Sequence, residues 1–205
     1  MYKKTFKRLV DFLISIFGMI ALLPFFVLIS LVLLFINKGR PFFFQKRPGK
    51  GEKIFSIIKF KSMTDAKDSN GALLPDEKRI TLFGNFIRKT SLDEIPQLIN
   101  VIKGDMSIIG PRPLHVKYLP YYTEKESIRH TVRPGITGLA QVSGRNLLQW
   151  EDRLQKDIEY VENLSFTTDL KIFFKTILKV ITAKDVAMEA SSGLLDLDDY
   201  RKLNQ

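Results

Sequence analysis

The chain has 205 residues and no cysteine, which excludes disulfides, thiolate nucleophiles and zinc–thiolate sites. Its 32 Lys and Arg exceed its 22 Asp and Glu, and the net charge of +10 suits anionic lipid headgroups, phosphorylated substrates or nucleic acid. Its two histidines, His115 and His130, are too few for a multi-histidine metal site, so carboxylates would have to hold any metal, which favours Mg²⁺.

The first predicted element is an apolar run over residues 12–36, FLISIFGMIALLPFFVLISLVLLFI, which contains no charged residue. A helix rises about 1.5 Å per residue, so this run reaches roughly 37 Å and exceeds the bilayer's hydrocarbon core of about 30 Å. Because the run is long and apolar all round, it favours a membrane segment over a buried core helix or a cleaved signal peptide. The chain after the membrane segment, about 165 residues, fits one domain.

Pro24 lies near the centre of this run, where proline bends or breaks a helix. Basic residues flank both ends of the run, and basic residues favour the cytoplasmic side of a membrane. We therefore expect residues 1–38 to form a re-entrant helix–break–helix anchor, followed by a domain over 39–190 and a tail over 191–205. A proline-kinked helix that spans the bilayer is the alternative. The flanking residues are Lys3, Lys4, Lys7 and Arg8 before the run and Lys38, Arg40, Lys46, Arg47, Lys50 and Lys53 after it.

The elements after the anchor predict a mainly helical α+β domain. Strands over 42–46 and 54–60, joined by a turn over 48–51, predict a β-hairpin just outside the bilayer. The polar stretch over 65–75 predicts a mobile loop. Helices are predicted over residues 76–89, 93–103, 149–163 and 169–183, the second of them ending at Gly104.

The last of these helices is basic and amphipathic. Lys171, Lys175 and Lys179 recur four residues apart, and apolar residues occupy another face. A helix of this kind suits the plane of a membrane surface. An ordinary surface helix that covers the core explains the pattern equally well.

The block over residues 88–112, RKTSLDEIPQLINVIKGDMSIIGPR, contains an adjacent carboxylate pair where a helix begins. Ser91 and Glu94 can form a capping box, or Asp93 can be the N-cap with Pro96 in the first turn, which we prefer. In either case the positive helix end lowers the carboxylate pKa values and attracts phosphate. Plain capping is the alternative to a chemical role.

Four cationic side chains of the chain could converge on an anion near this pair: Lys59, Lys61, Arg88 and Arg112. Each of them alone is more often a solvated surface charge. The sequence has no P-loop, no dinucleotide fingerprint and no evident Ser–His–Asp or Cys–His arrangement. A carboxylate pair, cations and a membrane segment together fit Mg²⁺-assisted phosphoryl chemistry on a lipid-linked substrate.

Segments along nearly the whole chain resemble the bacterial sugar transferases, which are monotopic phosphoglycosyl transferases. The resemblance implies a compact cytosolic catalytic domain over residues 39–190, amphipathic interfacial helices and the re-entrant anchor. It places the protein in the bacterial inner membrane with this domain on the cytoplasmic face. The segments are KFKSM (59–63), RKTSLDEIPQLINV (88–101), GDMSIIGPRP (104–113), RPGITGLAQVSGRN (133–146) and DIEYVENLSFTTDLKI (157–172).

The resemblance also implies a two-step reaction in which a UDP-sugar gives its sugar 1-phosphate to undecaprenyl phosphate and UMP is released. It makes Asp93 the nucleophile and Glu94 the ligand of Mg²⁺. Arg112 and Arg145 match family arginines and are assigned to phosphate or nucleotide contact, together with Lys59 and Arg88. Asp157 and Asp169 match acidic family positions, although helix-surface or capping roles explain them equally well.

The closest likeness within the family is to members that transfer N,N′-diacetylbacillosamine phosphate in N-linked protein glycosylation, where other enzymes of the glycan pathway are possible partners. The alternatives are the same reaction with another nucleotide sugar for polysaccharide synthesis, a Mg²⁺-dependent lipid phosphatase, and a membrane-anchored basic scaffold or nucleic-acid binder. No nucleic-acid motif supports the last alternative, so no nucleic-acid partner is expected. Leu23 departs from the serine that often precedes the breaking proline in the family, so the hairpin prediction rests on Pro24 and on charge.

Overall fold

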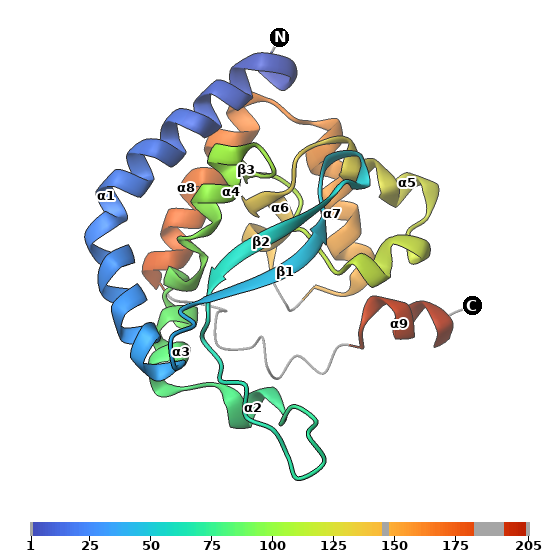
Figure 1. The fold of residues 1–205 in the computed structure, drawn as a ribbon. Coiled ribbons are helices and arrows are strands. Elements are labelled where there is room, and N and C mark those ends of the chain that lie inside the picture. The colour runs from blue at the N-terminus through green and yellow to red at the C-terminus, as the bar shows by residue number, and fades with distance from the viewer. Residues whose placement is uncertain (1, 145–147, 183–194, 204–205) are drawn as a thin grey trace.

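The computed structural model describes residues 2–144, 148–182 and 195–203. Its elements confirm a mainly helical α+β chain with small sheets and a long apolar helix at the N-terminus (Figure 1). The α-helices are α1 (Lys7–Ile36), α2 (Asp76–Arg79), α3 (Leu82–Lys89), α4 (Gln97–Lys103), α5 (Glu124–Ser127), α6 (Leu139–Ser143), α7 (Trp150–Glu162), α8 (Phe166–Thr182) and α9 (Leu197–Leu203). The strands are β1 (Phe42–Pro48), β2 (Ile54–Phe60), β3 (Ser107–Ile109) and β4 (Gly135–Thr137). A π-helix, η1 (Tyr2–Phe6), precedes α1, and 3₁₀-helices are η2 (Lys50–Glu52), η3 (Leu92–Glu94), η4 (Val116–Tyr121) and η5 (Ile128–Thr131).

The apolar run forms one helix, α1, and Pro24 lies inside it. Figure 1 shows that α1 bends in its middle and does not fold back into two antiparallel helices. Proline removes one backbone hydrogen bond and forces a bend, which does not require the helix to end. The membrane segment is therefore a continuous bent helix here, and it is the one helix among the described residues that is long and apolar enough to cross a membrane.

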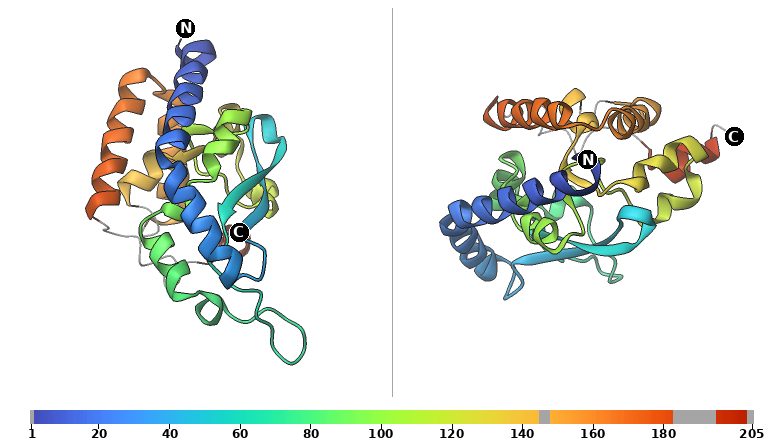
Figure 2. Two further views of the ribbon diagram at one scale, coloured as in Figure 1. Left: turned by 60° about the vertical axis from the view of Figure 1, so that its left-hand side comes forward. Right: turned by 90° about the horizontal axis from the view of Figure 1, so that it is seen from above.

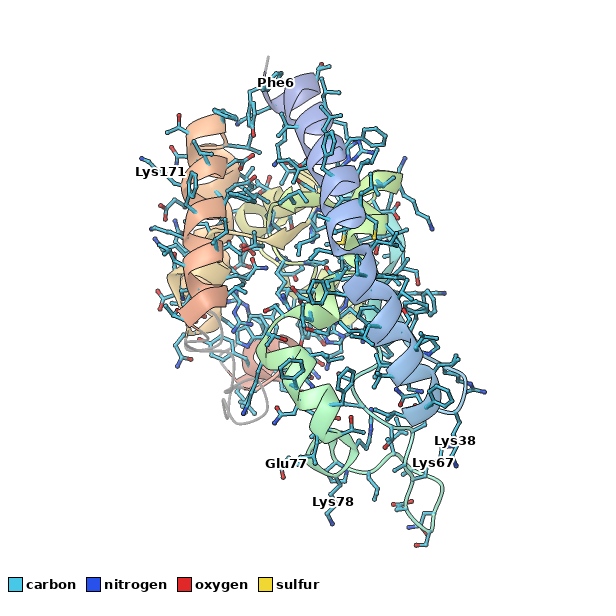
Figure 3. The ribbon with its side chains drawn as sticks, turned by 90° about the vertical axis from the view of Figure 1, so that its left-hand side faces the viewer. Phe6, Lys38, Lys67, Glu77, Lys78 and Lys171 are labelled. Atoms are coloured by element: carbon cyan, nitrogen blue, oxygen red, sulfur yellow. The ribbon has the colours of Figure 1, made fainter. Side chains whose placement is uncertain are left out.

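Both ends of α1 are attached to the same globular body. Near its start, the Lys7 ammonium lies 2.7 Å from Oδ2 of Asp169 on α8. Just past its end, the Asn37 amide donates to the Lys61 carbonyl at 2.8 Å. Figure 3 shows α1, α8 and α3 on one face of the molecule, with Phe6 and Lys38 at opposite ends of α1.

The predicted β-hairpin is confirmed. β1 pairs antiparallel with β2 in a register that places Phe42 opposite Phe60. Phe26 of α1 packs on this pair with ring centroids 5.7 Å from Phe42 and 5.3 Å from Phe60, so the hairpin lies directly against the apolar helix. The sequence did not predict a second sheet, in which β3 and β4 pair in parallel.

The helix predicted over residues 76–89 is divided in the structure. α2 ends at Arg79 because Ile80 forms a β-bridge with Met63, and α3 begins after Thr81. The Thr81 hydroxyl caps α3 by accepting from the Gly84 amide at 2.9 Å. The helices predicted over 149–163 and 169–183 correspond to α7 and α8, although α8 begins three residues earlier than predicted, and residue 183 lies outside the described residues.

The sequence left open whether α8 covers the core or lies at a membrane surface, and α8 has an apolar face suited to each role. Ile172 is buried in the central core, as expected of a helix that covers it. Phe174 and Leu178 are exposed, so α8 also presents a second apolar strip beyond the one that packs inward. Lys171 points away from α1 on the outer side of α8 (Figure 3).

Candidate active site

The carboxylate pair lies on a tight turn between α3 and α4. Asp93 and Glu94 end the 3₁₀-helix η3, and the α-helix begins only at Gln97, after Pro96. Ser91 has a left-handed backbone with φ 57°, and its side chain makes no cap hydrogen bond. Both predicted caps are wrong: Ser91 is left-handed where an N-cap residue needs an extended backbone, and Asp93 lies inside η3, so that Pro96 occupies the N-cap position of α4.

One ammonium group lies within ion-pair distance of both carboxylates. The Lys59 Nζ of β2 lies 2.7 Å from Glu94 Oε1 and 3.5 Å from Asp93 Oδ2. The Arg112 Nη1 lies 3.3 Å from the same Glu94 oxygen. Burial alone would raise the Glu94 pKa, but the charges of Lys59 and Arg112 outweigh it and hold the pKa well below its usual range. Glu94 is therefore an anion at neutral pH.

The pair opens into a cavity of about 320 Å³. Lys59, Arg88 and Arg112 line it, so the structure brings these predicted phosphate-binding residues together beside the carboxylates. Lys61 was considered with them, but it is not among the lining residues and its ammonium pairs with Asp65 instead. Arg145 lies outside the described residues.

The cavity has an apolar wall as well as a charged one. Leu22 of α1 and Val180 of α8 line it together with Ile95 of the turn and Leu98 of α4. α1 thus contributes a side chain two residues before Pro24 to the site that holds the carboxylate pair. The arrangement can receive a molecule with a phosphate at one end and hydrocarbon at the other.

A buried ion pair that the sequence reading missed lies in the same cavity. The Arg129 guanidinium donates to Asp157 Oδ2 from Nε at 3.1 Å and from Nη2 at 2.8 Å. It also donates to the Arg112 carbonyl at 2.7 Å and to the Tyr122 hydroxyl at 2.9 Å. Asp157 is therefore neither a helix-surface nor a capping residue but the counter-ion of Arg129. Only the resemblance pointed to Asp157, and nothing in the local sequence marked Arg129.

Asp169 is also buried and fully engaged. Its carboxylate accepts from the Tyr2 hydroxyl at 2.6 Å, from Lys7 at 2.7 Å and from the Tyr160 hydroxyl at 2.8 Å. These partners come from η1, α1 and α7, so Asp169 joins the first residues of the chain to the core. Asp169 is not a lining residue of the cavity.

Asp93 and Glu94 are residues that could hold a divalent cation. Mg²⁺ is usually held by one or two carboxylates, with substrate phosphates and waters completing its octahedron. Glu94 is ionised and partly open to the cavity, and Asp93 lies beside it. The Lys59 ammonium between them shows that this position already favours positive charge.

The sequence matches a family model described as bacterial sugar transferase over residues 2–183. The uncharacterized sugar transferase EpsL of Bacillus subtilis (strain 168) is 49% identical over 181 residues, which cover 88% of this chain and 89% of that protein. The exopolysaccharide production protein ExoY of Sinorhizobium fredii (strain NBRC 101917 / NGR234) is 39% identical over 195 residues, which cover 87% and 86%. The UDP-glucose:undecaprenyl-phosphate glucose-1-phosphate transferase of Klebsiella pneumoniae is 38% identical over 185 residues, which cover 85% of this chain and 40% of that longer protein.

The range matched by the family model contains α1, the carboxylate pair and every described residue that lines the cavity. Two of the relatives match this chain over most of their own length as well as over most of its length. The chain is therefore an enzyme that belongs to the bacterial sugar transferase family.

Proposed function

We propose that this enzyme transfers a sugar 1-phosphate from a UDP-sugar to undecaprenyl phosphate, releases UMP, and so starts the assembly of an exopolysaccharide. The observation that carries the proposal is the pair of Asp93 and Glu94, which shares one Lys59 ammonium inside a cavity lined by arginines and by Leu22 of the apolar helix. The names of the relatives support the substrates and the pathway: one uses UDP-glucose and undecaprenyl phosphate, and another is an exopolysaccharide production protein.

In the first step, a carboxylate oxygen of Asp93 attacks the phosphorus that bears the sugar. The bond from this phosphorus to the bridging oxygen of the diphosphate breaks, UMP leaves, and the sugar phosphate is joined to Asp93 as an acyl phosphate. In the second step, a phosphate oxygen of undecaprenyl phosphate attacks the same phosphorus, and the Asp93 carboxylate leaves. The product carries a diphosphate between the lipid and the sugar, and the enzyme is restored.

The surrounding charges let an anion approach an anion. Lys59, Arg88 and Arg112 offset the repulsion between the Asp93 carboxylate and the diphosphate, and they act in a cavity partly shielded from water. Glu94 would hold Mg²⁺, which neutralises the diphosphate when it is bound. Because one site uses both substrates in turn, the kinetics are expected to be ping-pong.

We also propose that α1 enters the membrane and returns, so that both of its ends face the cytoplasm. The attachments of Lys7 to Asp169 and of Asn37 to Lys61 support this, because both ends of α1 hold the same globular body. The basic residues at both ends agree with it. Since the chain has no cysteine, Lys3→Cys and Arg40→Cys each introduce a single label site. A membrane-impermeant thiol reagent should reach both from the cytoplasmic side, and labelling from opposite sides would contradict the re-entrant anchor.

The activity is tested by UMP release from a panel of UDP-sugars in the presence of undecaprenyl phosphate and Mg²⁺. UDP-glucose, UDP-galactose and UDP-N,N′-diacetylbacillosamine form the core of the panel, since the first two fit exopolysaccharide synthesis and the third fits protein glycosylation. Preference for the third would replace the exopolysaccharide assignment. The donor alone should yield a protein heavier by one sugar phosphate, with the modification at Asp93. If no donor releases UMP, the proposed function is wrong.

A further inference from the structure

The C-terminal segment lies outside the range that the family model matches, and it packs against Trp150 and Leu154 of α7. The family model ends at residue 183, whereas the segment 195–203 contains α9 and lies against η4 and α7. Leu197 is fully buried in a cluster with Trp150 and Leu154 of α7. The Trp150 indole Nε1 donates to the Leu195 carbonyl at 2.9 Å. The segment thus fixes the indole ring both by packing and by a hydrogen bond.

Charged contacts hold the same segment in place. Asp196 accepts from the Tyr118 hydroxyl at 2.8 Å and from the Lys117 ammonium at 2.6 Å. Arg201 pairs with Glu126 of α5. These contacts come from both ends of the segment, so it is docked along its length and not only at Leu197.

The fixed indole supports a guanidinium that faces the cavity. The Arg153 Cζ lies 4.6 Å from the centre of the Trp150 ring, one helical turn further along α7, and Arg153 lines the cavity. Stacking on an aromatic ring holds the planar guanidinium in one orientation and leaves its edge available for hydrogen bonds. Among the described residues, no hydrogen bond or ion pair joins Arg153 to a carboxylate, and Arg129 binds Asp157 Oδ2 through two nitrogens.

Arg153 lies in a region with several cations. Burial, and then the neighbouring charge of Arg112, lower the Arg153 pKa, and the charge of Asp157 offsets this only in part. A planar fork of this kind binds a phosphate through two parallel hydrogen bonds. The position predicts an anionic group of the substrate.

The place of Arg153 in the fold favours the soluble substrate over the lipid. α9 and the adjoining end of α7 lie across the molecule from α1, as Figures 1 and 2 both show. The apolar wall of the cavity comes from the opposite side, from Leu22 and Val180. The hydrocarbon chain of the acceptor fits that apolar wall. The nucleotide diphosphate of the donor therefore fits the opposite side of the cavity, where Arg153 lies.

We propose that Arg153 binds the nucleotide diphosphate of the sugar donor and that the segment 195–203 positions Arg153 through Trp150. Arg153 contacts the substrate, whereas Leu197 acts only through the indole. This inference rests on the proposed use of a UDP-sugar, and it adds a binding residue and a positioning segment that lies beyond the family's matched range.

The test compares the KM for the UDP-sugar with the KM for undecaprenyl phosphate in the full-length enzyme. Arg153→Gln should raise the donor KM about tenfold or more, since a charge-assisted hydrogen bond is lost, and should leave the acceptor KM within twofold. Arg153→Lys, which keeps the charge but not the fork, should recover part of the loss. Direct binding of UDP, measured by calorimetry without turnover, should weaken by the same factor in Arg153→Gln.

The positioning role is tested by a double-mutant cycle. Leu197→Ala should raise the donor KM severalfold in the wild-type background but should add little in the Arg153→Gln background, because the residue it positions is gone. Leu203→Ala, at an exposed position on the same helix, is the matched control and should change neither KM. A purely structural role for the segment would make the two effects independent.

The outcomes separate this inference from the proposed function. If the wild-type enzyme releases UMP and Arg153→Gln binds UDP and uses the donor normally, Arg153 is not a donor-binding residue. A rise in the acceptor KM alone would move Arg153 to the lipid phosphate and would also overturn the inference. If Leu197→Ala changes the donor KM equally in both backgrounds, the segment does not act through Arg153.

Discussion

Two carboxylate–cation groups line the same cavity and differ in how deeply their side chains are buried. In the first, Asp93 and Glu94 share the Lys59 ammonium, and their side chains are 12% and 17% exposed. In the second, the side chains of Arg129 and Asp157 are 2% and 3% exposed and are held by paired hydrogen bonds. In the proposed mechanism Asp93 and Glu94 react and bind the metal, whereas the more deeply buried pair of Arg129 and Asp157 supports the cavity wall.

The largest expected effect follows from Asp93→Asn. An amide cannot form the acyl phosphate, so we expect turnover to fall by roughly a thousandfold or more while the thermal unfolding midpoint changes little. UMP release and differential scanning fluorimetry of the purified enzyme measure the two quantities. Asp152→Asn, on the exposed face of α7, is the matched control. Near-normal turnover of Asp93→Asn would show that the nucleophile lies elsewhere.

The next effect concerns Asp157 and should appear in stability. Asp157→Asn leaves the buried Arg129 guanidinium without its counter-ion, and breaking such a pair costs about 3–5 kcal/mol. We expect the unfolding midpoint of the enzyme in lipid nanodiscs to fall, and activity to fall with the folded fraction. Replacing both partners, Arg129→Met with Asp157→Leu, should destabilise the protein less than Asp157→Asn alone. A stable but inactive Asp157→Asn would instead place Asp157 among the reacting residues.

The third prediction concerns the metal requirement of the pair formed by Asp93 and Glu94. Glu94→Gln removes the charge that would hold Mg²⁺, so the Mg²⁺ concentration for half-maximal activity should rise at least 10- to 100-fold, as expected when a metal site is weakened. A Mg²⁺ titration of UMP release measures it, with the exposed Glu77→Gln as control. An unchanged Mg²⁺ dependence would remove the metal role from Glu94.

The smallest expected effect is on the pH dependence of stability, and it concerns His130, which follows Arg129 of the buried ion pair in the sequence. Burial, and then the Arg129 charge, lower the His130 pKa to about 4. The unfolded chain therefore binds a proton more readily below pH 6.5, and stability should fall by about 2 kcal/mol as the pH drops from 7 to 5. His130→Phe keeps the ring contact with Tyr122 and should remove this part of the pH dependence. Equal slopes for both proteins between pH 5 and pH 7 would contradict the lowered pKa.

Local patterns predicted those parts of the molecule that depend on neighbours in the sequence. The β-hairpin follows from two apolar strands and a glycine turn, and Gly104 ends α4 with a left-handed φ of 95° as expected. The carboxylate pair, Arg88 and Arg112 stand out because the block 88–112 is compact and resembles a known family, whereas Lys59 lies outside that block in β2. These signals need no knowledge of how distant segments meet.

Contacts between residues that are far apart in the sequence determine the features that the sequence did not predict. α2 stops at Ile80 because Met63, from another segment, bridges to it. In the sequence alone, Arg129 resembles an ordinary surface arginine. In the structure, α7 places Asp157, which is 28 residues away, beside it. The segment 195–203 is polar and short, and only its contact with Trp150 gives it a role. In each case the deciding partner lies far along the chain.

The attachment of Lys7 to Asp169 has a consequence for how the protein is made. The two residues are 162 positions apart, so at about 5–20 residues per second the ribosome needs roughly 10 to 30 seconds to add the second after the first. During this interval α1 exists without the contact that fixes its first turns. The final geometry of α1 is therefore reached only after α8 has been made, and a nascent chain released before α8 would carry an α1 with its first turns unattached.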